Sequence, residues 1–251
     1  MPSTTITNSK TSMENDVDTN PLTKLGLPQP ILLGSASFTR KLILKEMNVP
    51  FHKVVRPIDE KALGDRSKDP PHELVLTLAN AKMDHLVNEL QQGKIGFDEL
   101  PIREETDATE GWIFLTGDQV VTCQGNILEK PESLEEAKEF VQQYGENPPS
   151  TVGSCVLHHV PSNIRVAGVD TATIYFNPTT LTSAAANTLV DTLLEQGEPV
   201  MSCAGGLMIE HPLVQDHVDR IDGTQDSVMG LSKPLVEQLL QELAEKLKEK
   251  N

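Results

Sequence analysis

The segment from Ile31 to Arg40 constrains the fold of this chain more than any other stretch. Its residues read Ile-Leu-Leu-Gly-Ser-Ala-Ser-Phe-Thr-Arg, an apolar run that leads into small hydroxyl residues. A helix is predicted to follow from Phe38 to about Asn48, with Ser37 as its N-cap and Pro50 as its stop signal. The segment therefore predicts a strand, a tight polar turn and a helix in immediate succession.

Arg40 and Lys41 occupy the first turn of that predicted helix. Unpaired N–H groups and the positive end of the helix dipole favour an anion there, so two cations are locally unfavourable. A phosphate bound by the hydroxyls, the backbone N–H groups and Arg40 would explain the pattern. The alternative is a solvated Arg and Lys on an ordinary capped helix, and this stretch alone does not decide between the two.

Length and charge narrow the class of protein. The 251 residues suffice for one large α/β domain or two small ones. No apolar run approaches the roughly 20 residues of a membrane span, so no membrane partner is expected. The net charge of −16 and the lack of a basic cluster argue against a nucleic-acid partner. An acidic protein can still bind a small phosphate ligand through a few local cations and a divalent metal.

Cysteine usage and the N-terminal sequence bear on the compartment. Cys123, Cys155 and Cys203 are odd in number and widely spaced, so we expect reduced, buried thiols rather than redox or nucleophilic groups. Residues 1–28 are rich in Ser, Thr and Asn and lack the arginines of a mitochondrial transit peptide. They are predicted to form a disordered tail on a cytoplasmic protein.

Asp69-Pro70-Pro71 is predicted to open a long helix that reaches about Gln91, with Asp69 as its cap and proline in its first turn. On a helical wheel, Lys82 falls inside the apolar arc of this helix. A lysine there either extends past the core to solvent or directs its ammonium at a buried anion. The arc itself consists of Leu74, Val75, Leu78 and Ala81.

Asp118 is the leading candidate for chemistry. It lies between two apolar strand runs, 112–116 and 120–123, where an acid is unfavourable to bury without a partner. The alternative is a structural aspartate in a turn. A hairpin signal at 124–126 is expected to return the chain and bring Lys130 near Asp118, although Lys130 alone also fits a surface lysine at a strand end.

Other acidic residues and the rest of the chain complete the prediction. Asp59 and Glu60 follow an earlier strand and are either metal ligands or solvated. Residues 93–111 are predicted to form an acidic surface loop, and 245–251 a frayed end. Strands and helices alternate along most of the chain, which predicts a mixed α/β sheet. The further elements predicted are a helix at 133–145, paired strands at 151–160 and 164–176, a helix at 182–196 and a final helix capped by Ser232.

Five elements in this order resemble the Maf family of nucleoside triphosphate pyrophosphatases over about residues 30–243. The resemblance implies an α/β fold with an elongated, twisted mixed sheet flanked by helices, and two lobes around a nucleotide-binding cleft, in a domain of about 29–244. The matching elements are Gly34-Ser35-Ala36-Ser37-Phe38-Thr39-Arg40, Asp59-Glu60, Leu78-Ala79-Asn80-Ala81-Lys82, Gly117-Asp118-Gln119-Val120-Val121 with Glu129-Lys130-Pro131, and Ala204-Gly205-Gly206 with Gly230-Leu231.

The resemblance also implies an activity. Members hydrolyse a nucleoside triphosphate to the monophosphate and pyrophosphate with a divalent cation, Mg²⁺ or Mn²⁺, often as a homodimer. Asp118 would accept the proton of the attacking water, and Glu60, with Asp118, would bind the metal. Whether Asp118 acts as base, metal ligand or both is not separable from sequence. The implied phosphate ligands are Ser35, Ser37, Arg40, Lys82 and Lys130.

Three departures from the common family pattern concern the substrate. Thr39 stands where Arg or Trp is frequent, Gln119 where members acting on thymidine and uridine triphosphates have Thr, and Glu210 where Gln is frequent. Gln119 and Glu210 together resemble the subgroup that acts on 7-methyl-GTP. The carboxylate of Glu210 could recognise such a base, because it can accept hydrogen bonds from a guanine edge or favour a cationic base. The alternatives are a pyrophosphatase for dTTP, UTP or CTP, a solvated role for Glu210, and a noncatalytic nucleotide-binding regulator of cell division.

Overall fold

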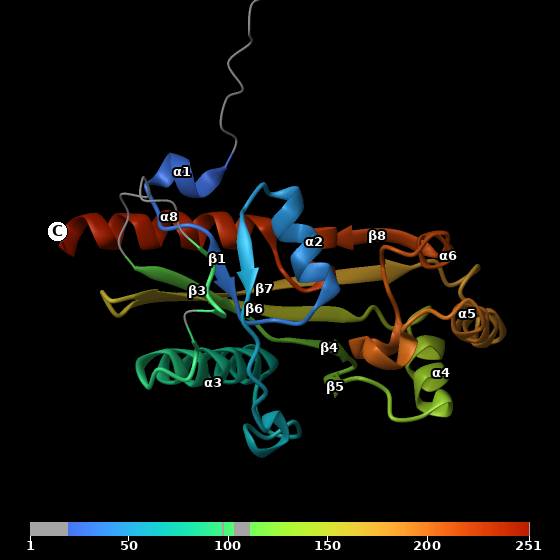
Figure 1. The fold of residues 1–251 in the computed structure, drawn as a ribbon. Coiled ribbons are helices and arrows are strands. Elements are labelled where there is room, and N and C mark those ends of the chain that lie inside the picture. Colours follow the sequence, from blue (N-terminus) through green and yellow to red (C-terminus); the bar gives the residue numbers. More distant parts are fainter. Residues whose placement is uncertain (1–19, 97, 103–110, 251) are drawn as a thin grey trace, which may run out of the picture.

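A computed structural model of the chain describes residues 20–96, 98–102 and 111–250. It has one mixed sheet with helices on both faces, so the predicted α/β class is confirmed (Figure 1). Within the part of the chain that is described, no helix combines the length and apolar character needed to cross a membrane.

The sheet is built around two long antiparallel strands, β6 and β7. Strands β1, β2 and β3 pair in parallel at one end, whereas the other pairings are antiparallel. The predicted hairpin at 124–126 is confirmed, because β4 and β5 pair across Gln124-Gly125. The strands are β1 Ile31–Leu33, β2 Phe51–Lys53, β3 Trp112–Thr116, β4 Gln119–Cys123, β5 Asn126–Leu128, β6 Ser150–Val160, β7 Ile164–Phe176 and β8 Val218–Asp222.

Two of these strands share one edge of β6. β3 pairs with residues 156–160 of β6, and β4 pairs with residues 150–153. The chain therefore leaves the first half of the sheet and enters the second half at Gly117 and Asp118, opposite Ser154. This break in the edge is the point at which the predicted catalytic aspartate lies.

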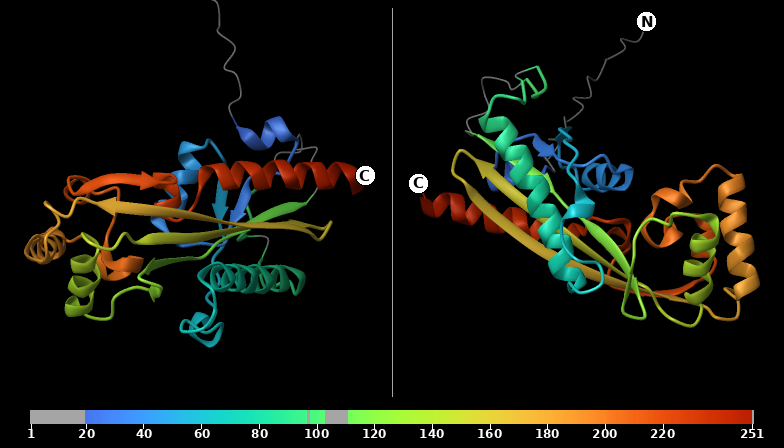
Figure 2. Two further views of the ribbon diagram at one scale, coloured as in Figure 1. Left: turned by 180° about the vertical axis from the view of Figure 1, so that it is seen from behind. Right: turned by 90° about the horizontal axis from the view of Figure 1, so that it is seen from below.

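Helices cover the two faces of the sheet unequally. α3 packs against β3 and β6 on one face, and α8 packs against β6 and β7 on the other (Figure 2). The helices are α1 Pro21–Leu25, α2 Phe38–Glu46, α3 Pro71–Gln91, α4 Leu134–Gln143, α5 Ser183–Glu195, α6 Pro212–Gln215, α7 Gln225–Met229 and α8 Lys233–Lys250, with 3-10 turns η1 Glu60–Ala62, η2 Val200–Ser202 and η3 Ala204–Gly206.

The buried side chains form separate cores at the two ends of the sheet. One core joins α1, α2 and α8 to β1 and β3, and a second lies under α3. A further core lies at the far end and joins α4 and α5 to β4, β7 and the 200–214 segment. Figure 2 shows these two groups of helices at opposite ends of the long strands. The break at Asp118 lies between them.

The predicted disordered tail at 1–28 is wrong for the residues that the structure describes. Residues 21–25 form α1, whose N-cap Asn20 accepts a hydrogen bond from the backbone N–H of Leu22. Leu22 is fully buried and belongs to the same core as α8. Its apolar side chain fixes a segment whose composition alone predicts no structure. Residues 1–19 lie outside the described residues.

Two further predictions about the ends of elements need correction. The frayed end predicted at 245–251 is helical as far as Lys250, because Leu247 still packs against the core. Asp69 does not cap α3, because the N-cap is Pro70. The carboxylate of Asp69 accepts a hydrogen bond from the backbone N–H of Asp65 instead. The acidic loop predicted at 93–111 falls partly outside the described residues, but Ile95 within it is buried under α3.

Candidate active site

Asp118 is held by the backbone of β6 rather than by a turn of its own. Its N–H donates to Oγ of Ser154 at 3.1 Å, and its carbonyl accepts from the N–H of Ser154 at 2.9 Å. The hydroxyl of Ser154 in turn donates to the carbonyl of Val75 on α3. Gly117 permits this close approach, because a Cβ there would lie 2.5 Å from the carbonyl oxygen of Ser154. The aspartate is thus fixed to the sheet on both sides of its Cα.

Lys82 of α3 directs its ammonium at this aspartate. Its Nζ lies 2.6 Å from Oδ1 of Asp118 and 3.0 Å from Oε1 of Glu60. The side chains of Lys82 and Asp118 are only 16% and 10% exposed. Of the two interpretations of a lysine in the apolar arc, the buried anion is confirmed and the extension to solvent is wrong.

Glu60 contacts Lys82 from η1, a single turn between β2 and α3. Asp118, Lys82 and Glu60 together are called the Asp118 cluster below. The carboxylate of Asp59 caps this turn by accepting from the N–H of Ala62. Asp59 therefore has a local structural contact, whereas Glu60 contacts Lys82. The Glu60 side chain is about half exposed at 48%, so it forms the outer edge of the cluster.

The pKa of the Asp118 carboxyl is subject to opposing effects. Burial raises its pKa above the ordinary value of an aspartate, and this is the largest effect. The nearby Lys82 and Arg40 lower the pKa, and Glu60 raises it, but the net direction is upward. A raised pKa brings a carboxylate closer to the range in which it accepts protons usefully near neutral pH.

Arg40 is buried, so its interpretation as a solvated residue on a capped helix is wrong. Its guanidinium turns from the start of α2 towards three oxygens: Nε donates to the carbonyl of Gly230, and Nη1 donates to the carbonyl of Gly117 and to Oγ of Ser35. None of these bonds uses Nη2. Burial lowers the pKa of the guanidinium, an effect that nearby Asp118 opposes. Arg40 thus joins the loop before α2 to the break that bears Asp118.

The hydroxyl groups before α2 bond to one another and to the helix. Ser37 is the N-cap, as predicted, because its Oγ accepts from the backbone N–H of Arg40. The same Oγ lies 2.8 Å from Oγ1 of Thr39, and Oγ of Ser35 accepts from the N–H of Ser37. Ser35, Ser37 and Thr39 therefore form one short polar network at the N-terminus of α2, next to the Arg40 guanidinium.

Gln119, the first residue of β4, extends towards α7. Its Nε2 donates to the carbonyl of Val228 at 3.0 Å, and its Oε1 lies so close to Gly230 that a Cβ there would meet it at 1.9 Å. Gly230 ends α7 with a φ of 107°, which favours glycine. The segment from α7 to Gly230 therefore supports both Gln119 and Arg40.

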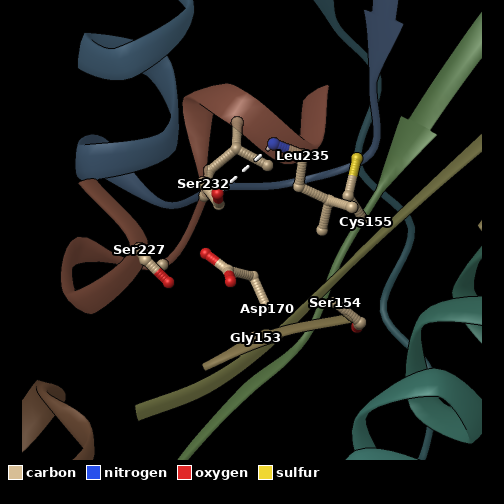
Figure 3. A pocket seen from close by; sticks show the side chains of 9 residues that line it. Gly153, Ser154, Cys155, Asp170, Ser227, Ser232 and Leu235 are labelled. Atoms are coloured by element: carbon tan, nitrogen blue, oxygen red, sulfur yellow. Dashed lines mark hydrogen bonds between the residues drawn. The ribbon is translucent and has the colours of Figure 1, made fainter. Parts of the chain in front are cut away.

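A narrow pocket lies behind this segment. Figure 3 shows Asp170 and the Ser227 hydroxyl pointing into it, with Ser232 above. The Ser227 hydroxyl has no hydrogen-bond partner among the described residues. The pocket has no space that a water molecule could occupy, so it is not a substrate site. A hollow of about 430 Å³ between α5 and α6 includes none of the predicted site residues.

Lys130 and Glu210 lie near Cys203, beside the glycine-rich turn. Both act on the pKa of Cys203, which is raised to about 11: burial is the largest cause, Glu210 adds to the rise and Lys130 opposes it. Lys130 is exposed and Glu210 is partly exposed. The charged groups with the largest effects on the pKa of Asp118 are Lys82, Arg40 and Glu60. The proximity of Lys130 to Asp118 stays a prediction.

Comparison with known proteins places this arrangement in a family. The family profile described as Maf-like protein matches residues 30–243. The chain belongs to the Maf family. It is 31% identical over 217 residues to the 7-methyl-GTP pyrophosphatase of Dictyostelium discoideum, covering 86% of this chain and 98% of that one. It is 28% identical over 212 residues to the dTTP/UTP pyrophosphatase of Salinibacter ruber, covering 84% and 89%. A nucleoside triphosphate pyrophosphatase of a Synechococcus strain is 27% identical over 215 residues, covering 85% and 94%.

The carboxylates of this Maf protein form a partial donor set for a metal. Glu60 and Asp118 both lie within 3.0 Å of the Lys82 ammonium, so a single small cation could contact both. Carboxylate oxygens suit Mg²⁺ and Mn²⁺. No group of three or more metal-binding side chains occurs in the described ranges. Two carboxylates fit a metal that completes its coordination with water and phosphate, as Mg²⁺ commonly does.

Sequence reasoning misses residues whose contacts are long-range. Ser154 is a buried hydroxyl inside a predicted strand, and that unusual position is the signal that could have revealed it. Arg66 forms bonds around Glu60 and gives no local signal. α7 is a helix that the sequence analysis does not predict, although the Thr224 hydroxyl that caps it is a typical N-terminal signal.

Proposed function

We propose that this Maf protein hydrolyses nucleoside triphosphates to the nucleoside monophosphate and pyrophosphate. One observation carries the proposal: a buried carboxylate, Asp118, at a break in the sheet, 2.6 Å from the ammonium of Lys82. A protein that only binds a nucleotide has no need of an acid beside the phosphates, because it would repel them. The names of the relatives point to the same reaction.

In this reaction Asp118 serves as the proton acceptor. The oxygen of a water attacks the α-phosphorus, the bond from that phosphorus to the bridging oxygen breaks, and pyrophosphate leaves. The water proton goes to Oδ2 of Asp118, because Oδ1 is already bonded to Lys82. The raised pKa favours this transfer relative to an ordinary aspartate.

Lys82 and Arg40 counter the negative charge that develops on the phosphoryl oxygens. Both are buried or nearly so, and in a site with little water each charge acts more strongly than on an open surface. Ser35, Ser37 and the N-terminus of α2 provide hydroxyl and N–H groups for the same phosphates. We assign Lys130 to the phosphates further from the attacked phosphorus, because it is exposed, whereas Lys82 is largely buried against Asp118.

A divalent cation completes the proposal. Glu60 and Asp118 would hold it, and when bound it would neutralise phosphate charge and acidify the attacking water. Asp118 then has two roles, as metal ligand through one oxygen and as proton acceptor through the other.

The proposed substrate is 7-methyl-GTP or a similar modified nucleotide. Gln119 and Glu210 match that subgroup, and a relative of this name covers most of the chain. A carboxylate at Glu210 suits a cationic base or the N–H groups of a guanine edge. The alternative substrates are dTTP, UTP and CTP, of which the name of the dTTP/UTP pyrophosphatase among the relatives supports the first two. A homodimer and a cytoplasmic location stay predictions.

Pyrophosphate release from a panel of triphosphates tests the proposal. The panel contains 7-methyl-GTP, GTP, UTP, dTTP and CTP, each with Mg²⁺, with Mn²⁺ or with EDTA. We expect turnover with a metal, loss of turnover in EDTA and in Asp118→Asn, and 7-methyl-GTP as the best substrate. Turnover that survives Asp118→Asn would overturn the assigned base. Binding without turnover on every member would favour the nucleotide-binding regulator.

A further inference from the structure

Arg66 stands in the loop between η1 and α3 and bonds to the turn that presents Glu60. Its Nη2 donates to the carbonyl of Glu60 at 3.0 Å, and its Nη1 donates to the carbonyl of Leu63. The Arg66 side chain is 22% exposed and that of its ion-pair partner Glu129 is 49% exposed, so the arginine is the more covered member of the pair. The backbone position of Glu60 is therefore set in part by one arginine that is not adjacent to it.

The same guanidinium reaches a second segment. Nε of Arg66 lies 3.4 Å from Oε1 of Glu129, the residue immediately before Lys130. The backbone of Glu129 is itself fixed, because its carbonyl accepts from the N–H of Gly205 in the glycine-rich turn. Arg66 thus links the Glu60 turn to a segment that is anchored to the far lobe, by which we mean the end of the sheet that carries α4 and α5.

An arginine is suited to this link, and a lysine is not. The guanidinium carries donors in several fixed directions, which lets it bond to two carbonyls and a carboxylate at once. A second ion pair, Lys61 with Glu132, also joins the two segments at 3.4 Å, but its side chains are 86% and 81% exposed. Such an exposed pair contributes little.

We propose that Arg66 and Glu129 form a clasp that holds Glu60 and Lys130 at the separation required by a metal-bound triphosphate. The two residues are positioning residues, since they act through their neighbours rather than on the phosphates. The inference rests on the proposed function. It adds a link between the two lobes that the motifs of the sequence do not contain.

A double-mutant cycle tests the clasp, with Arg66→Ala, Glu129→Ala and the double variant. We expect kcat/KM to fall about fivefold in Glu129→Ala, the upper range for a partly exposed ion pair. Arg66→Ala should lose about tenfold or more, because the Glu60 turn also loses its carbonyl bonds. The double variant should be no worse than Arg66→Ala, since the pair acts as a unit. The concentration of Mg²⁺ for half-maximal activity should rise with each loss.

Lys61→Ala is the matched control, because it removes an exposed cation from η1, next to the same loop, and should leave activity unchanged. Additive losses in the double variant would overturn the clasp, since they would mean that Arg66 acts on the substrate independently of Glu129. Unchanged activity in both single variants, with the wild type active, would overturn it as well.

Hydrogen exchange without substrate separates this inference from the proposed function. Amides at 60–66 should exchange about fivefold faster in Arg66→Ala and in Glu129→Ala than in the wild type or Lys61→Ala. This result would support the clasp even if every triphosphate in the panel failed as a substrate. Equal exchange in all four proteins would overturn it even if the pyrophosphatase activity were present.

Discussion

The Asp118 cluster and the Lys130 segment are the two sides of the proposed site, and they are built differently. Asp118 and Lys82 come from a strand end and a long helix, and their side chains are 10% and 16% exposed. Lys130 and Glu210 come from loops beside the glycine-rich turn, and both are at least partly exposed. Rigid elements hold groups within the small tolerances of chemistry, whereas loops vary without loss of the fold. We therefore expect the rate of hydrolysis to depend on the Asp118 cluster, and the choice of substrate to depend on the segment that carries Lys130.

The largest expected effect is on the buried side. Asp118→Asn should lower kcat by about 10³-fold or more, because an amide cannot accept the water proton. The measurement is pyrophosphate release under saturating 7-methyl-GTP. Circular dichroism of the variant should be unchanged, since Asn preserves the shape of the side chain. A rise in KM with an unchanged kcat would contradict the claim that the buried Asp118 side sets the rate.

Lys82→Met comes next, with an expected loss of about 10²-fold in kcat/KM from a missing cation at the phosphoryl oxygens. The pH profile sharpens the result. Lys82 lowers the pKa of Asp118, so its removal raises that pKa further. Because the base must be ionised, the acid limb of kcat/KM should move to higher pH. A limb that stays in place would mean that Asp118 is not the titrating base.

Lys130→Met should have a smaller effect of about tenfold, expressed mainly in KM, because the lysine is exposed and is assigned to binding. High salt should reduce the difference between this variant and the wild type, since an exposed charge is screened. Lys45→Met, on an exposed position of α2, serves as the control. A loss in kcat as large as that of Lys82→Met would show that the two sides do not divide the work as described.

Glu210→Gln should change preference rather than rate. The ratio of kcat/KM for 7-methyl-GTP to that for UTP is expected to fall about tenfold, the scale of one lost charge-assisted hydrogen bond. The kcat for the best substrate should change little. An unchanged ratio would remove Glu210 from the specificity residues and leave Gln119 and Thr39 as the candidates.

The smallest effect concerns stability. The folded-state pKa of Asp118 is raised, so its favourable contribution is present at low pH and is lost as pH rises through that pKa. Asp118→Asn lacks this titration. The melting temperature of the variant relative to the wild type should therefore increase as pH is raised from about 3.9, the ordinary pKa of an aspartate, towards neutrality. Thermal melts across that range measure it, and a difference that is flat with pH would contradict the pKa direction.

Sequence reasoning succeeds where the signal is local, or where a charged residue occupies a position that the pattern predicts to be apolar. Lys82 in an apolar arc and Asp118 between two strands each demand a partner, and each is the partner of the other. The N-cap role of Ser37 follows from a capping signal, and the start of α3 follows from its proline signal although the predicted cap, Asp69, is wrong. These features are set by periodicity and by groups a few residues apart, which a single sequence contains.

It fails where the partner is distant along the chain. Arg40 bonds to Gly230, 190 residues away, and no local pattern reveals that the guanidinium turns inward. The same holds for Ser154 and for the pairing of β8 with β7. Leu22 falls within the predicted disordered tail because one buried leucine in a polar segment leaves composition almost unchanged. Tertiary contacts decide such positions.

Hydrolysis of 7-methyl-GTP in ¹⁸O-labelled water tests the central claim most directly. If Asp118 directs water to the α-phosphorus, mass spectrometry should find one ¹⁸O in the nucleoside monophosphate and none in the pyrophosphate. Label in the pyrophosphate, or release of inorganic phosphate as the first product, would place the attack at another phosphorus and contradict the role assigned to Asp118.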